Sequence, residues 1–140
     1  MGKSGIPERI LNKPERLTTD EYGIIRSHPV LGARILENIR NIEDGIEGVR
    51  QHHERYDGGG YPDGLAGEDI PLISRVISVA DAFDAMTSDR AYRQAMSIEA
   101  AIAEFEGGSG TQFEGALVVK MTELLRSGLM TPIKATLKVF

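Results

Sequence analysis

The sequence contains no cysteine and no tryptophan among its 140 residues, and only 6% of the residues are aromatic. Without cysteine, disulfides and thiolate metal sites are excluded, and a cytoplasmic location is expected. No apolar run is long enough to cross a membrane, and no signal peptide opens the chain. The net charge of −5 argues against a nucleic-acid polymer as partner, although a local basic pocket could still hold a small anion.

Alternation of apolar and polar residues with period two is also missing, whereas helical periodicity recurs, so the sequence predicts an all-α fold. Thr18 and Glu21 fit a capping box at the start of a helix that runs to about Ser27, and Pro29 predicts a break at His28. Further helices are expected over residues 30–39, 42–53, 72–88, 98–106 and 114–127. The segment 72–88 is apolar nearly all round, which predicts a buried central helix. A domain is expected over residues 1–128, followed by a tail over 129–140.

The chain has only three histidines, and two of them, His28 and His53, lie on apolar helical faces. His52 is the next residue around the helix from His53, so all three rings can aim at one region. A single inward histidine is most often a satisfied core residue. Three converging imidazoles instead indicate an open metal site, because imidazole is the commonest metal ligand in proteins.

Asp81 lies in the middle of the apolar segment "VISVADAF", where a carboxylate is costly unless it is paired or bound to metal. A salt bridge with Arg75 or Arg90 is one interpretation. We favour a fourth metal ligand, since the histidines need another partner. Asp84 lies almost one turn further on and is expected to support a ligand through a hydrogen bond.

Two further features suit a phosphate-bearing ligand. Arg90 and Arg93 would share a face on a helical turn and present two guanidinium groups to phosphate oxygens. The glycine-rich segment that contains Gly60, Tyr61 and Pro62 would let backbone approach a ligand and offer a stacking ring. Alternatively, the arginines are ordinary surface residues and the loop is only a tight connection.

The segment "HHERYDGGGYPDGLAGEDIPLISRVISVADAFDAMTSDRAYRQAMS" closely resembles the signature region of the HD-GYP family, and the similarity runs from Gly2 to about residue 125. That family is a branch of the HD superfamily of metal-dependent phosphohydrolases with a helical HD-domain bundle. The resemblance implies hydrolysis of cyclic di-GMP to pGpG or GMP with two or three divalent metals, often iron or manganese. It also implies contact of the Gly-Tyr-Pro loop with diguanylate cyclase domains.

The resemblance also implies individual roles. Histidines 28, 52 and 53 and Asp81 match metal ligands, and Lys3 matches a motif lysine near the substrate. Arg90 and Arg93 match positions that contact substrate phosphates. Gly60, Tyr61 and Pro62 match the loop at the edge of the site. Glu114-Gly115 stand where Asp-Pro is usual, and this departure is expected to alter only a helix start.

In the family a stretch like His-Asp-x-Gly-Lys-x-Gly-Ile-Pro precedes this region, and residues 2–7, "GKSGIP", fit its second half. We therefore expect an N-terminally truncated domain that lacks the His-Asp pair and the preceding helices. Such a chain is expected to hold one ion, to hydrolyse cyclic di-GMP poorly, and to self-associate through exposed apolar surface. The alternative function is a non-catalytic module that binds cyclic di-GMP or a diguanylate cyclase.

Overall fold

The computed structural model describes residues 6–90 and 93–132, and these residues form helices joined by loops without a β-strand. In chain order the helices are α1 (Glu8–Leu11), α2 (Thr19–Arg26), α3 (His28–Leu36), α4 (Glu43–Gln51), α5 (Leu72–Thr87), α6 (Ile98–Gly107) and α7 (Gly115–Arg126). A 3₁₀ turn, Gly67–Asp69, precedes α5. The all-α prediction is confirmed, and the domain limit at residue 128 stays a prediction.

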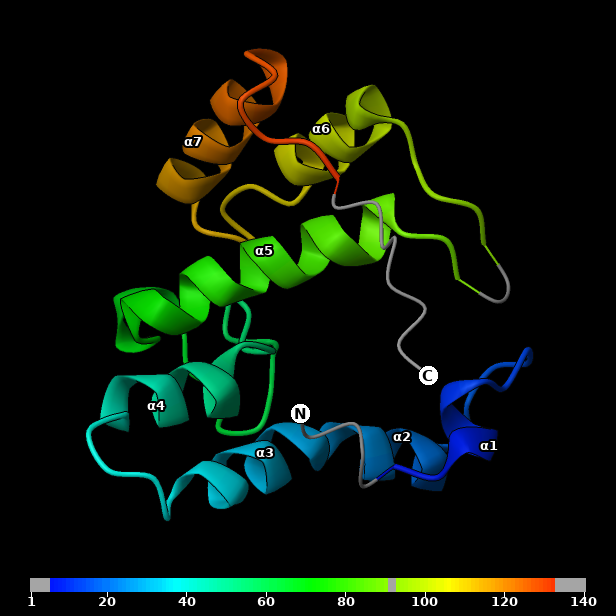
Figure 1. Cartoon of the computed structure of the whole chain (residues 1–140), viewed down its shortest axis with the longest axis vertical. Coiled ribbons are helices and arrows are strands. Elements are labelled where there is room, and N and C mark those ends of the chain that lie inside the picture. The colour runs from blue at the N-terminus through cyan, green and yellow to red at the C-terminus, as the bar shows by residue number, and fades with distance from the viewer. Residues whose placement is uncertain (1–5, 91–92, 133–140) are drawn as a thin grey trace.

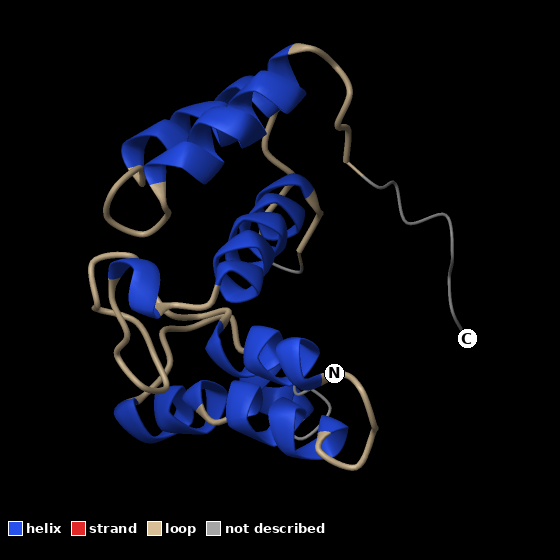
Figure 2. Ribbon diagram, turned by 90° about the vertical axis from the view of Figure 1, so that its left-hand side faces the viewer, coloured by secondary structure: helices blue, strands red, loops and turns tan. Residues whose placement is uncertain are grey.

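The helices lie in three layers (Figures 1 and 2). Helix α5 crosses the middle, α6 and α7 lie together on one side of it, and α3 and α4 lie on the other side. Helices α1 and α2 continue the lower layer beside α3. No helix in the described part of the chain is both long enough and apolar enough to span a membrane.

Local sequence signals account for the helix starts. Thr18 and Glu21 form the predicted capping box, and Ser97 accepts a hydrogen bond from the Ala100 amide at the start of α6. The predicted break near Pro29 falls at Ser27, one residue earlier, because proline fits the first turn of a new helix. The segment 8–11, for which no helix was predicted, forms the short helix α1.

The core lies where α6 and α7 pack on the second half of α5, and it comprises Val79, Phe83, Phe105, Phe113, Val118, Met121 and Leu125. On the opposite side, Gly48 of α4 meets Ile73 and Ile77 of α5. A Cβ at Gly48 would lie only 2.8 Å from Ile77 Cδ1, so the absence of a side chain permits the close approach of the two helices. This packing places the C-terminal end of α4 against the middle layer.

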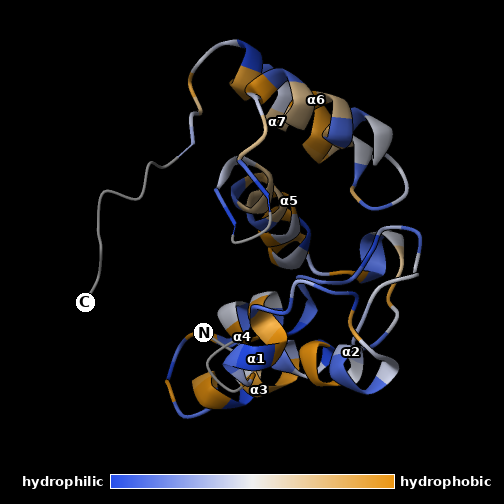
Figure 3. Ribbon diagram, turned by 90° about the vertical axis from the view of Figure 1, so that its right-hand side faces the viewer, coloured by the Kyte–Doolittle hydropathy of each residue, from blue (hydrophilic) through white to orange (hydrophobic). Residues whose placement is uncertain are grey.

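Helix α5 crosses the middle of the fold as the prediction of a central helix requires, but the prediction that it is buried is wrong for its first half. Its first half leaves Leu72, Ile73 and Val76 with exposed fractions of 58%, 40% and 43%. The neighbouring helices cover only part of its circumference, because α4 packs against one stripe and α6 and α7 against another. The hydropathy colouring shows apolar residues spread along α5 (Figure 3).

Candidate metal centre

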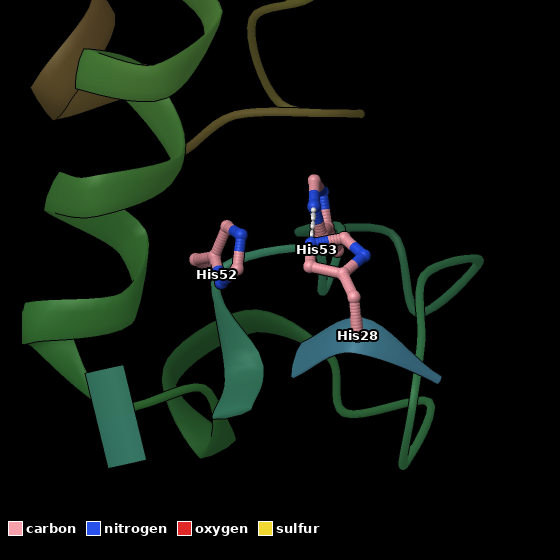
Figure 4. A group of neighbouring side chains, drawn as sticks. All are labelled: His28, His52 and His53. Carbon is pink, nitrogen blue, oxygen red and sulfur yellow. Dashed lines mark hydrogen bonds between the residues drawn. The ribbon is translucent and has the colours of Figure 1, made fainter. Parts of the chain in front are cut away.

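The three histidines come together where the start of α3 meets the end of α4 (Figure 4). Their ligand-type nitrogens lie within 4.8 Å of one another, with His28 buried and His52 and His53 half-buried. His28 Nε2 and His53 Nε2 are 3.1 Å apart. The ring centroids of His52 and His53 are 4.0 Å apart. Residues from two separate helices are thus brought to one point, as the sequence predicted.

Backbone carbonyls orient two of these rings. His28 Nδ1 lies 2.6 Å from the carbonyl oxygen of Ile25, and His52 Nδ1 lies 2.7 Å from that of Val49. A carbonyl oxygen only accepts, so each Nδ1 carries the proton and donates it. The lone pair of each neutral ring is then on Nε2, which is the tautomer that a metal ion requires when the other nitrogen is hydrogen-bonded.

The separation of the Nε2 atoms of His28 and His53 suits a shared ion. Two nitrogens bound at about 2.1 Å with angles of about 90° to 109° lie about 3.0 to 3.4 Å apart. The observed 3.1 Å fits that range, and it equally fits a hydrogen bond from His53 to His28. The chemistry and spacing of this donor set therefore fit a divalent metal ion.

Asp81 of α5 lines a cavity of about 180 Å³ together with His52, His53, Glu54, Arg55, Ser78, Ala82 and Gln112. It is not among the residues whose ligand atoms lie within 4.8 Å of one another. Neither Arg75 nor Arg90 forms an ion pair with Asp81 in the described residues. Arg75 pairs with Glu114 instead. The aspartate thus shares a cavity with His52 and His53 but is not part of the cluster of ligand atoms.

The Gly-Tyr-Pro segment packs directly on this group. The Tyr61 ring stacks on His53 with centroids 5.0 Å apart and planes 25° apart, and the Tyr61 amide donates to the His53 carbonyl. The Tyr61–Pro62 peptide bond is cis. A Cβ on Gly60 would overlap the backbone of His53, Glu54 and Arg55, so only glycine fits there. Gly60 and Tyr61 thus lie beside His53, and Pro62 follows them in the chain.

Burial raises the pKa of the Tyr61 hydroxyl to about 12, and the neighbouring Tyr22 and Asp81 act in the same direction. The positive charge of Arg26 opposes them. The phenol therefore stays neutral at physiological pH and stacks on His53 as an uncharged ring. A neutral ring adds no negative charge beside the histidines.

Glu54 is a functional candidate that the sequence interpretation missed. Its side chain is 3% exposed, and its two oxygens accept hydrogen bonds of 2.7 to 3.1 Å from the amides of Asp63, Gly64 and Leu65. Glu54 directly follows His53 in the chain. Its hydrogen bonds therefore hold the segment after Pro62 close to His53. A glutamate within a motif rich in charged residues gives no sequence signal of burial, so only the fold reveals this role.

The remaining candidates lie elsewhere or outside the described residues. Asp84 is exposed, accepts a hydrogen bond from Ser88 Oγ and lines a different cavity.

Arg90 and Arg93 follow α5, and no described contact joins them to the histidines. They do not form the expected helical turn, because their backbones exchange two hydrogen bonds as an antiparallel bridge. Residues opposite each other in such a bridge still share a face. Lys3 lies outside the described residues.

Comparison with known proteins identifies the family of the chain. The family model described as "HD domain" matches residues 1–117. The chain belongs to the HD-GYP branch of the HD domain family. Members of this family are metal-dependent, and the chain has a histidine cluster that could hold an ion. The resemblance drawn from the signature region is thereby confirmed.

Curated relatives support the same assignment. The chain is 46% identical to the cyclic di-GMP phosphodiesterase response regulator RpfG of Xanthomonas campestris, over 81% of this chain and 31% of that protein. It is 41% identical to a cyclic di-GMP phosphodiesterase of Thermotoga maritima, over 89% of this chain and 34% of that protein. A 3'3'-cGAMP-specific phosphodiesterase of Vibrio cholerae is 36% identical, over 88% and 24% respectively. The chain spans about a third of the length of the first two relatives.

Two solved structures share the fold. The HDG"Y"P protein Bd1817 of Bdellovibrio bacteriovorus matches with a TM-score of 0.68 and 18% identity, over 89% of this chain and 40% of that one. A cyclic GMP-AMP-specific phosphodiesterase of V. cholerae matches with a TM-score of 0.64 and 24% identity, over 94% of this chain and 35% of that one. At these identities the likeness concerns the fold alone, and it agrees with the helical layers described above.

Proposed function

We propose that this chain forms the metal-binding part of a phosphodiesterase that hydrolyses cyclic di-GMP. The observation that carries the proposal is the convergence of His28, His52 and His53 beside the cavity that Asp81 lines. The names of relatives 46% and 41% identical to this chain support cyclic di-GMP as the substrate. We also propose the cytoplasm as the location, since the chain has no cysteine.

Under this proposal the three imidazoles would hold a divalent iron or manganese ion, and Asp81 would contribute a carboxylate from the same cavity. A divalent ion supplies Lewis-acid chemistry, which makes water a better nucleophile towards phosphorus. The carbonyls of Ile25 and Val49 keep two rings in the ligating tautomer. Tyr61 covers the ring of His53 and limits access of water to that face.

The other predicted site residues complete the proposal. Lys3, Arg90 and Arg93 would bind substrate phosphate oxygens, and Gly60, Tyr61 and Pro62 would border the substrate. Asp84 would need a side-chain movement to support a ligand, because it now binds Ser88. The Gly-Tyr-Pro loop remains our proposed contact for a diguanylate cyclase domain.

We expect the donor set of the described residues to limit activity. Three imidazoles and one carboxylate suffice for one ion, whereas a site with two or three ions needs further bridging ligands. We therefore expect one metal per chain and slow turnover of cyclic di-GMP. Asp81 alone would hold a second ion only weakly.

The test is anaerobic reconstitution with Fe²⁺ or Mn²⁺, followed by elemental analysis and by chromatography of a cyclic di-GMP reaction. We expect about one ion in the wild-type chain, loss of that ion in His28→Ala, and retention in the control Asp89→Asn. Asp89 is exposed and belongs to the turn after α5. Absence of metal in the wild-type chain would refute the metal site, and rapid formation of linear product would refute the expected slow turnover.

A second function, binding of cyclic di-GMP without cleavage, is favoured by one observation. The cluster of ligand atoms consists of imidazoles alone, and Asp81 lies outside it. Calorimetry alongside the turnover assay separates the two functions: binding without product supports a binding module, and binding with product supports the enzyme.

A further inference from the structure

Arg26, at the end of α2, lies against the same tyrosine that covers His53. Its guanidinium carbon is 5.0 Å from the centroid of the Tyr61 ring and 5.8 Å from that of Tyr22. Tyr61 in turn stacks on His53. The side chain of Arg26 is therefore linked through one aromatic ring to the proposed metal site, although it lies far from the glycine-rich segment in the sequence.

The way in which Arg26 is held leaves its charge available. The arginines at positions 50, 55, 75 and 126 each pair with a carboxylate, whereas Arg26 forms no ion pair in residues 6–90 and 93–132. Its contacts are with ring faces, and a guanidinium that lies on a ring keeps its N–H groups in its own plane. A basic residue in the last turn of a helix needs no ligand to explain it, but the two aromatic contacts fix where this one points.

We propose that Arg26 binds the second phosphate of the cyclic dinucleotide, the phosphate that is not being cleaved. This inference rests on the proposed function. A cyclic dinucleotide carries two phosphodiester groups, and when one lies at the histidines the other needs its own cationic partner. Arg26 is exposed, reaches the site through Tyr61, and offers the planar pair of donors that suits two phosphate oxygens.

This assignment makes Arg26 a determinant of substrate class rather than of chemistry. It would favour ligands with two phosphates over ligands with one. Tyr22, whose exposed fraction is 47%, and Tyr61 act as supports that keep the guanidinium in place. The guanine base is not the expected partner, although its edge also offers two acceptors to an arginine.

The experiment measures binding of cyclic di-GMP and of cyclic GMP, which shares the guanine but carries one phosphodiester. Calorimetry is done on the metal-loaded full chain of the wild type, Arg26→Ala, Arg26→Lys and the control Arg34→Ala. Arg34 is likewise an exposed arginine in the last turn of a helix, α3. Circular dichroism and thermal melting verify that each variant is folded.

We expect Arg26→Ala to weaken binding of cyclic di-GMP about tenfold or more, as for the loss of a charged hydrogen bond, and to leave cyclic GMP unchanged. Arg26→Lys should recover part of the affinity, and Arg34→Ala should bind as the wild type does. Unchanged affinity in Arg26→Ala would overturn the inference alone. An equal loss for cyclic GMP would assign Arg26 to a group that both nucleotides share and would also overturn the inference. Failure of the wild type to bind cyclic di-GMP would refute the proposed function, and the inference with it.

Discussion

Glu114 stands at the N-terminus of α7, yet its carboxylate pairs with Arg75 of α5 at 2.6 Å. Both side chains are largely covered, with exposed fractions of 14% for Arg75 and 19% for Glu114. Arg75 also donates to the carbonyl of Ile70, so one guanidinium joins α7, α5 and the segment before α5. The departure from Asp-Pro at Glu114-Gly115 was expected to alter only a helix start. Glu114 also takes part in an ion pair that joins two helices, so that expectation was too narrow.

Replacing Glu114 by glutamine should lower the free energy of unfolding by about 1 to 3 kcal/mol, because Arg75 would keep its charge in a largely covered position without a counter-charge. Urea denaturation monitored by circular dichroism measures the change. The control is Glu123→Gln, which breaks the ion pair between Glu123 and Lys120. The side chain of Glu123 is 58% exposed and that of Lys120 is 75% exposed. That variant should differ from the wild type by less than about 0.5 kcal/mol. Equal effects of the two substitutions would contradict the structural role of the Arg75–Glu114 pair.

The connection between α4 and α5 owes its shape to one buried carboxylate. Glu54 accepts hydrogen bonds from three consecutive amides, those of Asp63, Gly64 and Leu65. The amide of Tyr61 is bound to the His53 carbonyl at the same time. These contacts fix both sides of the cis Tyr61–Pro62 peptide and hold the Tyr61 ring on His53.

We expect Glu54→Gln to destabilise the chain by about 1 to 3 kcal/mol, since the new NH₂ group would face backbone donors and leave a partly buried amide without an acceptor. Hydrogen exchange should show faster exchange of the amides of residues 63–65 in particular. The matched control is Glu68→Gln, an exposed glutamate in the same connection. Unchanged protection of these three amides in Glu54→Gln would disprove the role of Glu54 as a clamp.

How much of this could be predicted from the sequence differs between elements. The helices are found within a few residues because caps, prolines and periodicity are local signals, as the capping box of α2 illustrates. The three histidines were found because each falls on, or next to, an apolar face. The proposed role of Arg26 depends on a contact between segments far apart in the chain. The role of Glu54 depends on the path of the loop after it, and no local pattern encodes either contact. Arg90 and Arg93 were expected on a helical turn, but the backbone pairs them across a bridge.

At the scale of the whole molecule, apolar surface remains uncovered along α5. A groove of about 370 Å³ runs between α5 and α7, and its lining includes Val76, Phe83, Leu117 and Leu124. Exposed apolar residues also occur on α3 and after α7, where Leu129 is 81% exposed. Exposed apolar surface of this kind favours association, because burying it removes it from water.

The expected outcome is self-association that grows with protein concentration in sedimentation velocity experiments. Leu124→Glu, which places a charge in the lining of the groove at a side chain already 37% exposed, should shift the chain towards monomer without unfolding it. Leu129→Glu makes the same chemical change outside the groove lining and should have a weaker effect. Sedimentation of the wild type as a monomer at every concentration would show that the uncovered surface does not drive association. Equal shifts in the two variants would show instead that general charge, rather than the groove, controls it.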